Sequence, residues 1–211
     1  MSLRQGTSLH PVSPKDIPTL VDIHYEAFAD DALMKLMYGS HGDTASTVSD
    51  LREALKDPTA RFTKAVDNET GDIVGWSWWS VYLDAETHLE AAKTTEEEQK
   101  EAPKTAISPE TFLQYHAAVN DRRRRWITGK PGILQAIAVR PKSQGRGVGT
   151  AIVRAGLEEA KRNGVLAWLE ASSAGHGLYE KCGFRDVGEA IESDLGAYGK
   201  VTTVCMMYTR P

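Results

Sequence analysis

The chain has 211 residues, of which 41% are hydrophobic, and it carries a formal net charge of −4. This length and apolar content fit one large domain, or one and a half ordinary domains, with a true hydrophobic core. The negative charge argues against a nucleic-acid partner. No apolar run approaches the roughly 20 residues that a membrane helix needs, and the first residues lack the apolar core of a signal peptide. Because Cys182 and Cys205 show neither metal-ligand spacing nor a disulfide framework, we expect a cytoplasmic protein without a metal site or a membrane partner.

Residues 1–83 predict a strand, two helices and a pair of strands. Ser13 and Pro14 mark the first helix start, because Ser is a favoured N-cap and Pro is tolerated at the first helical position. Apolar residues then recur three or four positions apart as far as Phe28, which indicates one buried helix face. In chain order the expected elements are a strand over 9–12, a helix from 13 to about 30, a helix over 49–56, and strands over 61–66 and 73–83.

Residues 84–131 differ in character from their surroundings and indicate an insertion between two strands. Residues 86–101 are acidic and polar, which favours a mobile surface helix or loop. Ser108 and Pro109 begin a further helix that runs into a basic stretch at residues 122–125. No linker divides the chain, so we expect a single domain over 1–211, with the insertion between its third and fourth strands.

A short apolar run over 133–139 predicts a buried strand. Gly145, Gly147 and Gly149 follow it at alternate positions, and a helical pattern begins near Thr150. Glycines let the backbone turn with its N–H groups inward, and a helix N-terminus adds about half a positive charge. This strand, turn and helix start predict a site for an anionic group.

The spacing of these glycines narrows the choice of anion. A P-loop requires Lys after its last glycine, and no Lys follows Gly149. A dinucleotide fingerprint requires Gly-x-Gly-x-x-Gly, whereas the glycines here alternate. What remains, Gln144-x-x-Gly147-x-Gly149, resembles the pyrophosphate loop of the GNAT superfamily of acyl-CoA N-acyltransferases, which reads Gln/Arg-x-x-Gly-x-Gly/Ala. The alternative is a tight turn between a strand and a helix.

A second motif strengthens the resemblance. Residues 179–184 read Tyr-Glu-Lys-Cys-Gly-Phe, which is similar to the superfamily's Tyr-x-x-x-Gly-Phe signature. The predicted order, strand–helix–helix–strand–strand–strand–helix–strand–helix–strand–strand, matches the family over residues 9–208. The resemblance implies an α/β (α+β) GNAT fold, with a central mixed, mostly antiparallel sheet of six to seven strands, splayed in the middle, and helices on both faces. The last expected elements are a helix ending near 163, a strand over 165–169, a helix over 171–178, and strands over 185–189 and 202–208.

The resemblance also implies a binding site for acetyl-CoA. The main chain of Ile137, Ala138 and Val139 would pair with the pantetheine arm, and the N–H of Ile137 or its neighbour would polarise the thioester carbonyl. Ser172 stands where the family often has Asn, and its hydroxyl could replace that contact. The turn that would hold the pyrophosphate consists of Gln144, Gly145, Arg146, Gly147, Val148, Gly149 and Thr150.

Acetylation of an amine requires the amine to lose a proton and the thiolate to gain one. Tyr179 resembles the family's general acid, and the alternative is a half-buried tyrosine that packs the last helix. Glu170 at a strand end is the first choice of general base, with a solvated carboxylate as the alternative. His116 is the second, because imidazole titrates near neutrality. His24, His176 or a chain of water molecules are further options.

We expect the acceptor to be a small primary amine that attacks directly in a ternary complex. Phe28, Trp78 and His116 are candidate pocket residues, although aromatic residues on a strand more often belong to the core. Asp30 could attract a cationic amine, or it could simply be solvated. Two alternatives stay open, a peptide or protein acetyltransferase and a non-catalytic acyl-CoA-binding sensor that could lose Tyr179 without effect. The oligomeric state is open too, with a homodimer as one outcome.

Overall fold

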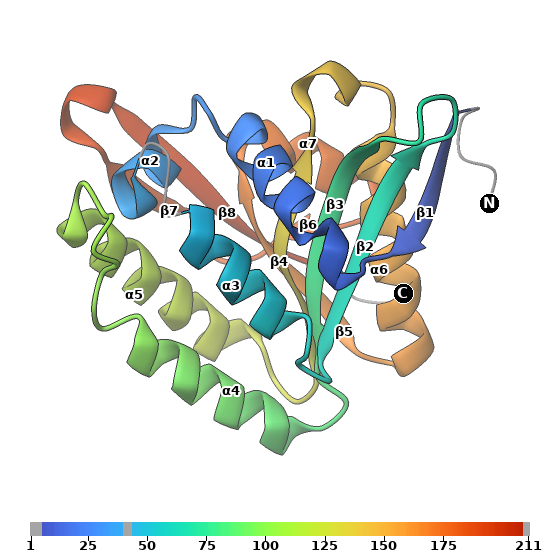
Figure 1. Cartoon of the computed structure of the whole chain (residues 1–211). Helices are drawn as coiled ribbons and strands as arrows, with labels where there is room; N and C mark the ends of the chain where they lie inside the picture. Colours follow the sequence, from blue (N-terminus) through green and yellow to red (C-terminus); the bar gives the residue numbers. More distant parts are fainter. Residues whose placement is uncertain (1–5, 40–43, 209–211) are drawn as a thin grey trace.

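The computed structural model describes residues 6–39 and 44–208. Across these residues the chain forms one sheet with helices on both faces (Figure 1). The strands follow the order β1-β2-β3-β4-β5-β8-β6, and β7 pairs with β8 off this path. The strands are β1 (Thr7–Pro11), β2 (Ala60–Asp67), β3 (Ile73–Val81), β4 (Pro131–Val139), β5 (Leu166–Ser172), β6 (Arg185–Asp186), β7 (Ile191–Asp194) and β8 (Lys200–Tyr208).

Helices fill most of the connections between these strands. Ser108 caps α5 as its sequence signal predicted, accepting a hydrogen bond from the Thr111 N–H. No helix within the described residues combines the length and the apolar character that a bilayer crossing requires. The α-helices in the described part of the chain are α1 (Ile17–Ala27), α2 (Ala32–Tyr38), α3 (Thr44–Ala54), α4 (Ala85–Glu98), α5 (Pro109–Trp126), α6 (Val148–Asn163) and α7 (Ser173–Lys181).

Neighbouring strands run antiparallel except for β4 and β5, which are parallel. This arrangement confirms the predicted α/β fold with a mixed, mostly antiparallel sheet. Two elements, α2 and β7, were not predicted. The short α2 begins with Asp31, whose side chain accepts from the Met34 N–H at 2.9 Å. β7 contributes one buried apolar residue, Ile191, and is held by its pairing with β8. Both elements depend on tertiary contacts more than on a local pattern.

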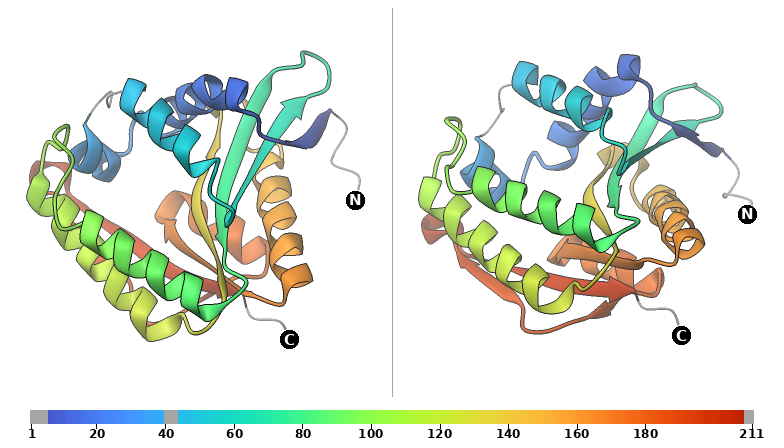
Figure 2. Two further views of the ribbon diagram at one scale, coloured as in Figure 1. Left: turned by 60° about the horizontal axis from the view of Figure 1, so that its bottom comes forward. Right: turned by 90° about the horizontal axis from the view of Figure 1, so that it is seen from below.

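The acidic segment after β3 forms the helix α4. Asp84 caps it, accepting a hydrogen bond from the Thr87 N–H at 2.8 Å. α4 lies alongside α5 (Figures 1 and 2), where Arg124 forms an ion pair with Glu96 at 2.7 Å. Both helices lie between β3 and β4 in the chain. Residues 84–131 are therefore mostly helical, and their two helices, α4 and α5, pack against each other.

The two faces of the sheet are covered by different helices (Figure 2). On one face, here called the α6/α7 face, Val153 and Tyr179 pack with Leu134 of β4. On the other, called the α1/α5 face, α1 and α3 pack over Trp76, and α5 packs further along over Ile133. A group bound between the central strands β4 and β5 could therefore be contacted by helices on both faces of the sheet.

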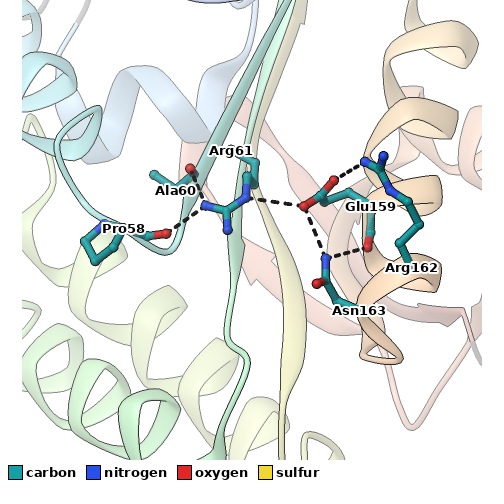
Figure 3. Close-up of polar contacts among 6 residues, drawn as sticks. All are labelled: Pro58, Ala60, Arg61, Glu159, Arg162 and Asn163. Carbon is teal, nitrogen blue, oxygen red and sulfur yellow. Dashed lines mark hydrogen bonds and ion pairs between the residues drawn. The ribbon is translucent and has the colours of Figure 1, made fainter.

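Polar contacts tie α6 to β2 (Figure 3). Arg61 Nε donates to Glu159 Oε1 at 3.4 Å, and Arg61 Nη1 donates to the Pro58 carbonyl oxygen at 2.7 Å. Glu159 also pairs with Arg162, and Asn163 Nδ2 donates to the Glu159 carbonyl oxygen at 2.9 Å. Of these contacts, the one between Arg61 and Glu159 joins the C-terminal half of α6 to β2.

Gly156 on α6 lies directly against Trp79 on β3. A Cβ atom at Gly156 would lie 2.3 Å from Trp79 Nε1. We expect Gly156→Ala to lower the free energy of unfolding by about 1–3 kcal/mol, because the helix would have to move off the sheet. Gly177→Ala on α7 is the matched control, since nothing lies within 4 Å of a Cβ there, and it should raise stability by about 0.4–1 kcal/mol. Chemical denaturation measures both, and equal stabilities would contradict this close packing.

Candidate active site

The central strands β4 and β5 pair at one end and diverge partway along their length. Their parallel pairing covers three residue pairs and ends at Ile133 and Trp168. β3 continues to pair with β4 as far as Val139, and β8 pairs with β5 as far as Ser172. The outer strands therefore hold both central strands while the two diverge. Among the described residues, one edge of β4 has no strand partner from residue 134 onward, and this interval is called the split below.

A β-bulge lies where the split begins. Trp79 pairs with Leu134 and Trp78 pairs with Ala136, so Gln135 is an extra residue on β4. A bulge bends its strand and increases the local twist. This bend carries the rest of β4 away from β5. Gln135 is also the exposed residue of an otherwise largely buried strand.

Alternation along β4 decides which main-chain groups face the split. The Arg140 N–H donates to the Val74 carbonyl oxygen on β3 at 2.9 Å. Successive residues of a strand direct their main-chain groups to opposite sides, so Ala138 also faces β3, whereas Ile137 and Val139 face the split. Of the three residues predicted to make main-chain contacts, Ile137 and Val139 thus face the split, although the Val139 carbonyl oxygen already accepts from Gln144 Nε2. The main-chain groups of Ala138 face β3 instead, where Ala138 pairs with Trp76.

The glycine turn joins β4 to α6 and leaves the helix start without a side-chain cap. Gly145 and Gly147 have φ angles of +71° and +87°, in the left-handed region that favours glycine. Gly147 is the N-cap of α6 and offers no side chain to the first N–H groups of the helix. Gln144 Nε2 donates to the Val139 carbonyl oxygen at 3.0 Å, which anchors the turn to the end of β4. Of the other predicted turn residues, Arg146 is exposed, Gly149 and Thr150 are half-buried, and Val148 is buried.

Tyr179 on α7 is buried beside the split. Its side chain is 6% exposed and packs in one cluster with Leu134 of β4 and Ala171 of β5, the two strands that diverge. Burial raises the pKa of Tyr179 above its ordinary value, so the hydroxyl stays protonated in the neutral range. A protonated phenol in this place can donate a proton to a group held in the split.

Ser172 begins α7, and its side chain is already engaged. The Ser172 Oγ accepts a hydrogen bond from the Gly175 N–H at 3.3 Å, which makes it the N-cap of the helix. The residue is exposed, and its hydroxyl proton remains available to donate. Any contact of Ser172 with a cofactor would therefore use the O–H as a donor.

Glu170 forms a buried ion pair. Arg123 on α5 donates to both carboxylate oxygens from Nε and Nη2, each at 2.8 Å, and Trp168 Nε1 donates to Oε1 at 2.6 Å. Burial acts to raise the pKa of Glu170, but the charge and hydrogen bonds of Arg123 outweigh it and hold that pKa below its ordinary value. A carboxylate in this state is a weak proton acceptor. The ion pair therefore weighs against the prediction that Glu170 is the general base.

His116 lies seven residues before Arg123 on α5 and is hydrogen-bonded to Tyr38. Its Nε2 lies 3.1 Å from the Tyr38 hydroxyl. Burial, together with the Arg123 charge, lowers the pKa of His116 to about 4, and burial raises the pKa of Tyr38 to about 12. Both groups are therefore neutral at physiological pH. With so low a pKa, His116 is a poor general base and a better hydrogen-bonding group.

The predicted acceptor residues fall into separate groups. Phe28 and Trp78 pack against the core cluster beneath α1, where Trp78 stacks on Phe62 with ring centroids 5.3 Å apart. His116 packs instead among aromatic residues of α2 and α5. Asp30 is exposed between α1 and α2. The structure brings Phe28 and Trp78 together and leaves the other two elsewhere.

Sequence reasoning missed Arg123 and Tyr38 as partners of the candidate residues. Arg123 belongs to a run of arginines that resembles an ordinary charged helix face. A separation of seven residues places Arg123 and His116 on the same side of α5. That spacing was the one signal in the sequence that linked the two residues. It does not indicate which residues of other elements they contact.

These features agree with comparisons to known proteins. Residues 114–186 match a family model described as an acetyltransferase (GNAT) domain. An acetyltransferase of Stachybotrys chartarum is 23% identical over 197 residues, which cover 90% of this chain and 85% of that protein.

Two solved structures share the fold at low sequence identity. The polyamine N-acetyltransferase of Drosophila melanogaster has a TM-score of 0.71 at 14% identity, covering 97% of this chain and 100% of that chain. Arylalkylamine N-acetyltransferase 2 of Aedes aegypti has a TM-score of 0.65 at 17% identity, covering 94% and 97%. With its splayed central strands, its glycine turn and the match of residues 114–186 to the family model, the chain is similar to the GNAT superfamily of acetyltransferases.

Proposed function

We propose that this protein is a GNAT acetyltransferase that uses acetyl-CoA to acetylate a primary amine by direct attack in a ternary complex. The observation that carries the proposal is the unpaired edge of β4 next to the uncapped start of α6. An extended chain with amide groups, such as the pantetheine arm, can pair with such an edge as a strand would. A pyrophosphate suits the N–H groups at the helix start. The residues on both sides of the split therefore fit this group.

The proposed roles divide between main chain and side chain. Bound acetyl-CoA supplies the thioester carbonyl that the amine attacks. The Ile137 N–H serves as a fixed donor to the carbonyl oxygen, and one such donor is typically worth roughly 3 kcal/mol in the transition state. The Tyr179 hydroxyl gives its proton to the departing sulfur. We assign no side chain as general base, because Glu170 is neutralised by Arg123 and His116 is a weak base; the amine proton leaves to solvent water.

Alanine substitutions at two glycines distinguish an effect on cofactor binding from an effect of backbone strain. Gly147 and Gly71 both have positive φ angles and open space where a Cβ would lie, but Gly71 lies in the turn between β2 and β3. Each Gly→Ala variant should lose about 1–2 kcal/mol of stability, because other residues are strained in the left-handed region. Only Gly147→Ala should also weaken the binding of acetyl-CoA, measured by calorimetry. Equal affinities in the two variants would contradict the role of the turn.

A small amine is favoured over a peptide as the acceptor. The two solved structures of the same fold are named for polyamine and arylalkylamine substrates. In this chain α2, α5 and the residue that follows β7 pack into one cluster through Leu36, Phe112 and Leu195. This packing covers part of the α1/α5 face, which disfavours an extended peptide on that side.

Thiol release across a panel of acceptors tests the proposal. The purified protein is given acetyl-CoA with agmatine, spermidine, tyramine, tryptamine or a lysine-containing peptide, and the product is identified by mass. Release that depends on a small amine supports the proposal, and release with the peptide alone favours the peptide acetyltransferase. Binding of acetyl-CoA without turnover of any acceptor would favour the sensor and overturn the proposed function.

A further inference from the structure

Gln135 is unusual because it is exposed in the middle of the sheet. β4 is flanked by β3 and β5, and the residues on either side of Gln135 are buried or half-buried. A polar side chain exposed on a central strand shows that the sheet is uncovered at this point. The exposed position coincides with the bulge that opens the split.

The carboxamide of Gln135 has a defined orientation. Its Nε2 donates to Ser80 Oγ at 3.2 Å. Ser80 is 4% exposed, so the partner of this hydrogen bond is buried. With Nε2 engaged in this way, the Oε1 atom is the end of the side chain left to accept hydrogen bonds from outside the protein.

Gln135 and Glu170 stand on opposite sides of the split. The last residue pair between the two strands is Ile133 and Trp168, which pack in one cluster on the α1/α5 face. Gln135 is the extra residue of the bulge, and its side chain reaches Ser80, which pairs with Ile133 and shares its face. Two residues after Trp168, the side chain of Glu170 returns to the face of α5, where it bonds Arg123. Glu170 is neutralised by Arg123, so it offers no free charge to a ligand there. Tyr179 meets the split from the other face.

We propose that Gln135 is a positioning residue for the acceptor amine, an inference that rests on the proposed N-acetyltransferase function. Its Oε1 accepts a hydrogen bond from one N–H of the neutral amine, which turns the nitrogen lone pair toward the thioester carbonyl. The amine thus approaches from the α1/α5 face, and the cofactor is held from the α6/α7 face. An amide oxygen is not protonated near neutral pH, so Gln135 orients the nucleophile without acting as a base.

The acetyl transfer that Gln135 assists requires no reactant besides acetyl-CoA, the amine and water. The nitrogen lone pair forms the new N–C bond as the C–S bond breaks. The sulfur receives the phenolic proton of Tyr179, which is replaced from solvent, and the amine proton passes to a water molecule at the uncovered face. Gln135 gains and loses no proton in this sequence.

Two substitutions separate the hydrogen bond from the bulge. Gln135→Met keeps the length of the side chain and removes the acceptor, so it should raise the KM of the amine about tenfold and leave the affinity for acetyl-CoA unchanged. Gln135→Glu keeps acceptor oxygens and should hold the amine KM within about threefold of wild type. Gln114→Leu on α5 is the matched control, because Gln114 is an exposed glutamine that bonds Glu110. Steady-state kinetics use the best substrate among agmatine, spermidine, tyramine and tryptamine.

The outcomes distinguish this inference from the proposed function. A wild-type amine KM in Gln135→Met, or equal damage in the Met and Glu variants, would overturn the positioning role while amine acetylation stood. A wild-type protein that binds acetyl-CoA and turns over no amine would overturn both. Thermal melting shows whether each variant is folded, and Gln135→Ala provides the same comparison if Gln135→Met melts early.

Discussion

Replacing Tyr179 by phenylalanine is expected to lower kcat for amine acetylation by about 10²-fold or more, the range of a lost general acid. The substitution removes only the hydroxyl, and the ring still packs with Leu134 and Phe184. Burial raises the pKa of Tyr179 above its ordinary value of 10.0, so the wild-type hydroxyl holds its proton throughout the neutral range. In the variant the sulfur must leave without that proton. Calorimetry should show an unchanged Kd for acetyl-CoA.

Tyr208→Phe is the matched control for this experiment. Tyr208 belongs to the edge of the same core, 5.9 Å from the Phe184 ring, but it pairs with Ala167 at the end of β5 far from Ser172. Its loss of a hydroxyl should leave kcat near the wild-type value. A wild-type kcat in Tyr179→Phe would remove the general-acid role, and a joint loss of turnover and cofactor affinity would point to a structural one.

Replacing Arg123 by leucine should lower the free energy of unfolding by about 3–5 kcal/mol. The side chains of Arg123 and Glu170 are 21% and 9% exposed, so the variant would leave a largely buried carboxylate without its cation. For a chain of this size the loss corresponds to a fall in Tm of roughly 6–20 °C. Thermal melting at neutral pH measures it.

Two further variants show whether the unpaired charge of Glu170 causes the loss of stability in Arg123→Leu. Arg124→Leu removes the neighbouring arginine, whose side chain is 57% exposed and pairs with Glu96, and should change stability by less than about 1 kcal/mol. Replacing Arg123 and Glu170 together by leucine should recover most of the loss, because no charge then remains buried. A double variant as unstable as Arg123→Leu would contradict this explanation.

The same pair predicts how stability depends on pH. Because the pKa of Glu170 in the folded protein lies below its ordinary value of 4.5, the contribution of the pair is complete above that pH. It should be lost as the pH falls through the lower, folded-state pKa. On acidification below pH 4.5, the Tm of the wild type should therefore fall relative to that of the double variant, which lacks the titrating carboxylate.

Local patterns in the sequence were sufficient to predict the strand, the glycine turn and the helix that follows it. The strand over 133–139, the alternating glycines and the helix that follows are close in the chain, and each signal is carried by the residues that form the structure. The Tyr179 motif lies within a single helix and its end. These elements were predicted from spacing, and the order of strands and helices then indicated the architecture.

The acceptor side could not be predicted in the same way. Glu170 was expected to be a free carboxylate, and its state is decided by Arg123, which lies 47 residues away in the chain. Gln135 carried no signal at all, because its exposure depends on a bulge in the register between β3 and β4. Register depends on which side chains meet across strands, and a shift of one residue reverses the faces.

By itself, the amino-acid sequence determined the order of the elements other than α2 and β7, together with the glycine turn at the start of α6 and the place of the tyrosine on α7. Each of these rests on contacts between near neighbours in the chain. Only the tertiary structure decided that β4 parts from β5 at Ile133, that Arg123 neutralises Glu170, and that Gln135 lies uncovered at the split. The physical reason is that strand pairing and buried ion pairs join residues that are distant in sequence, and no local periodicity records which partner each of them will meet.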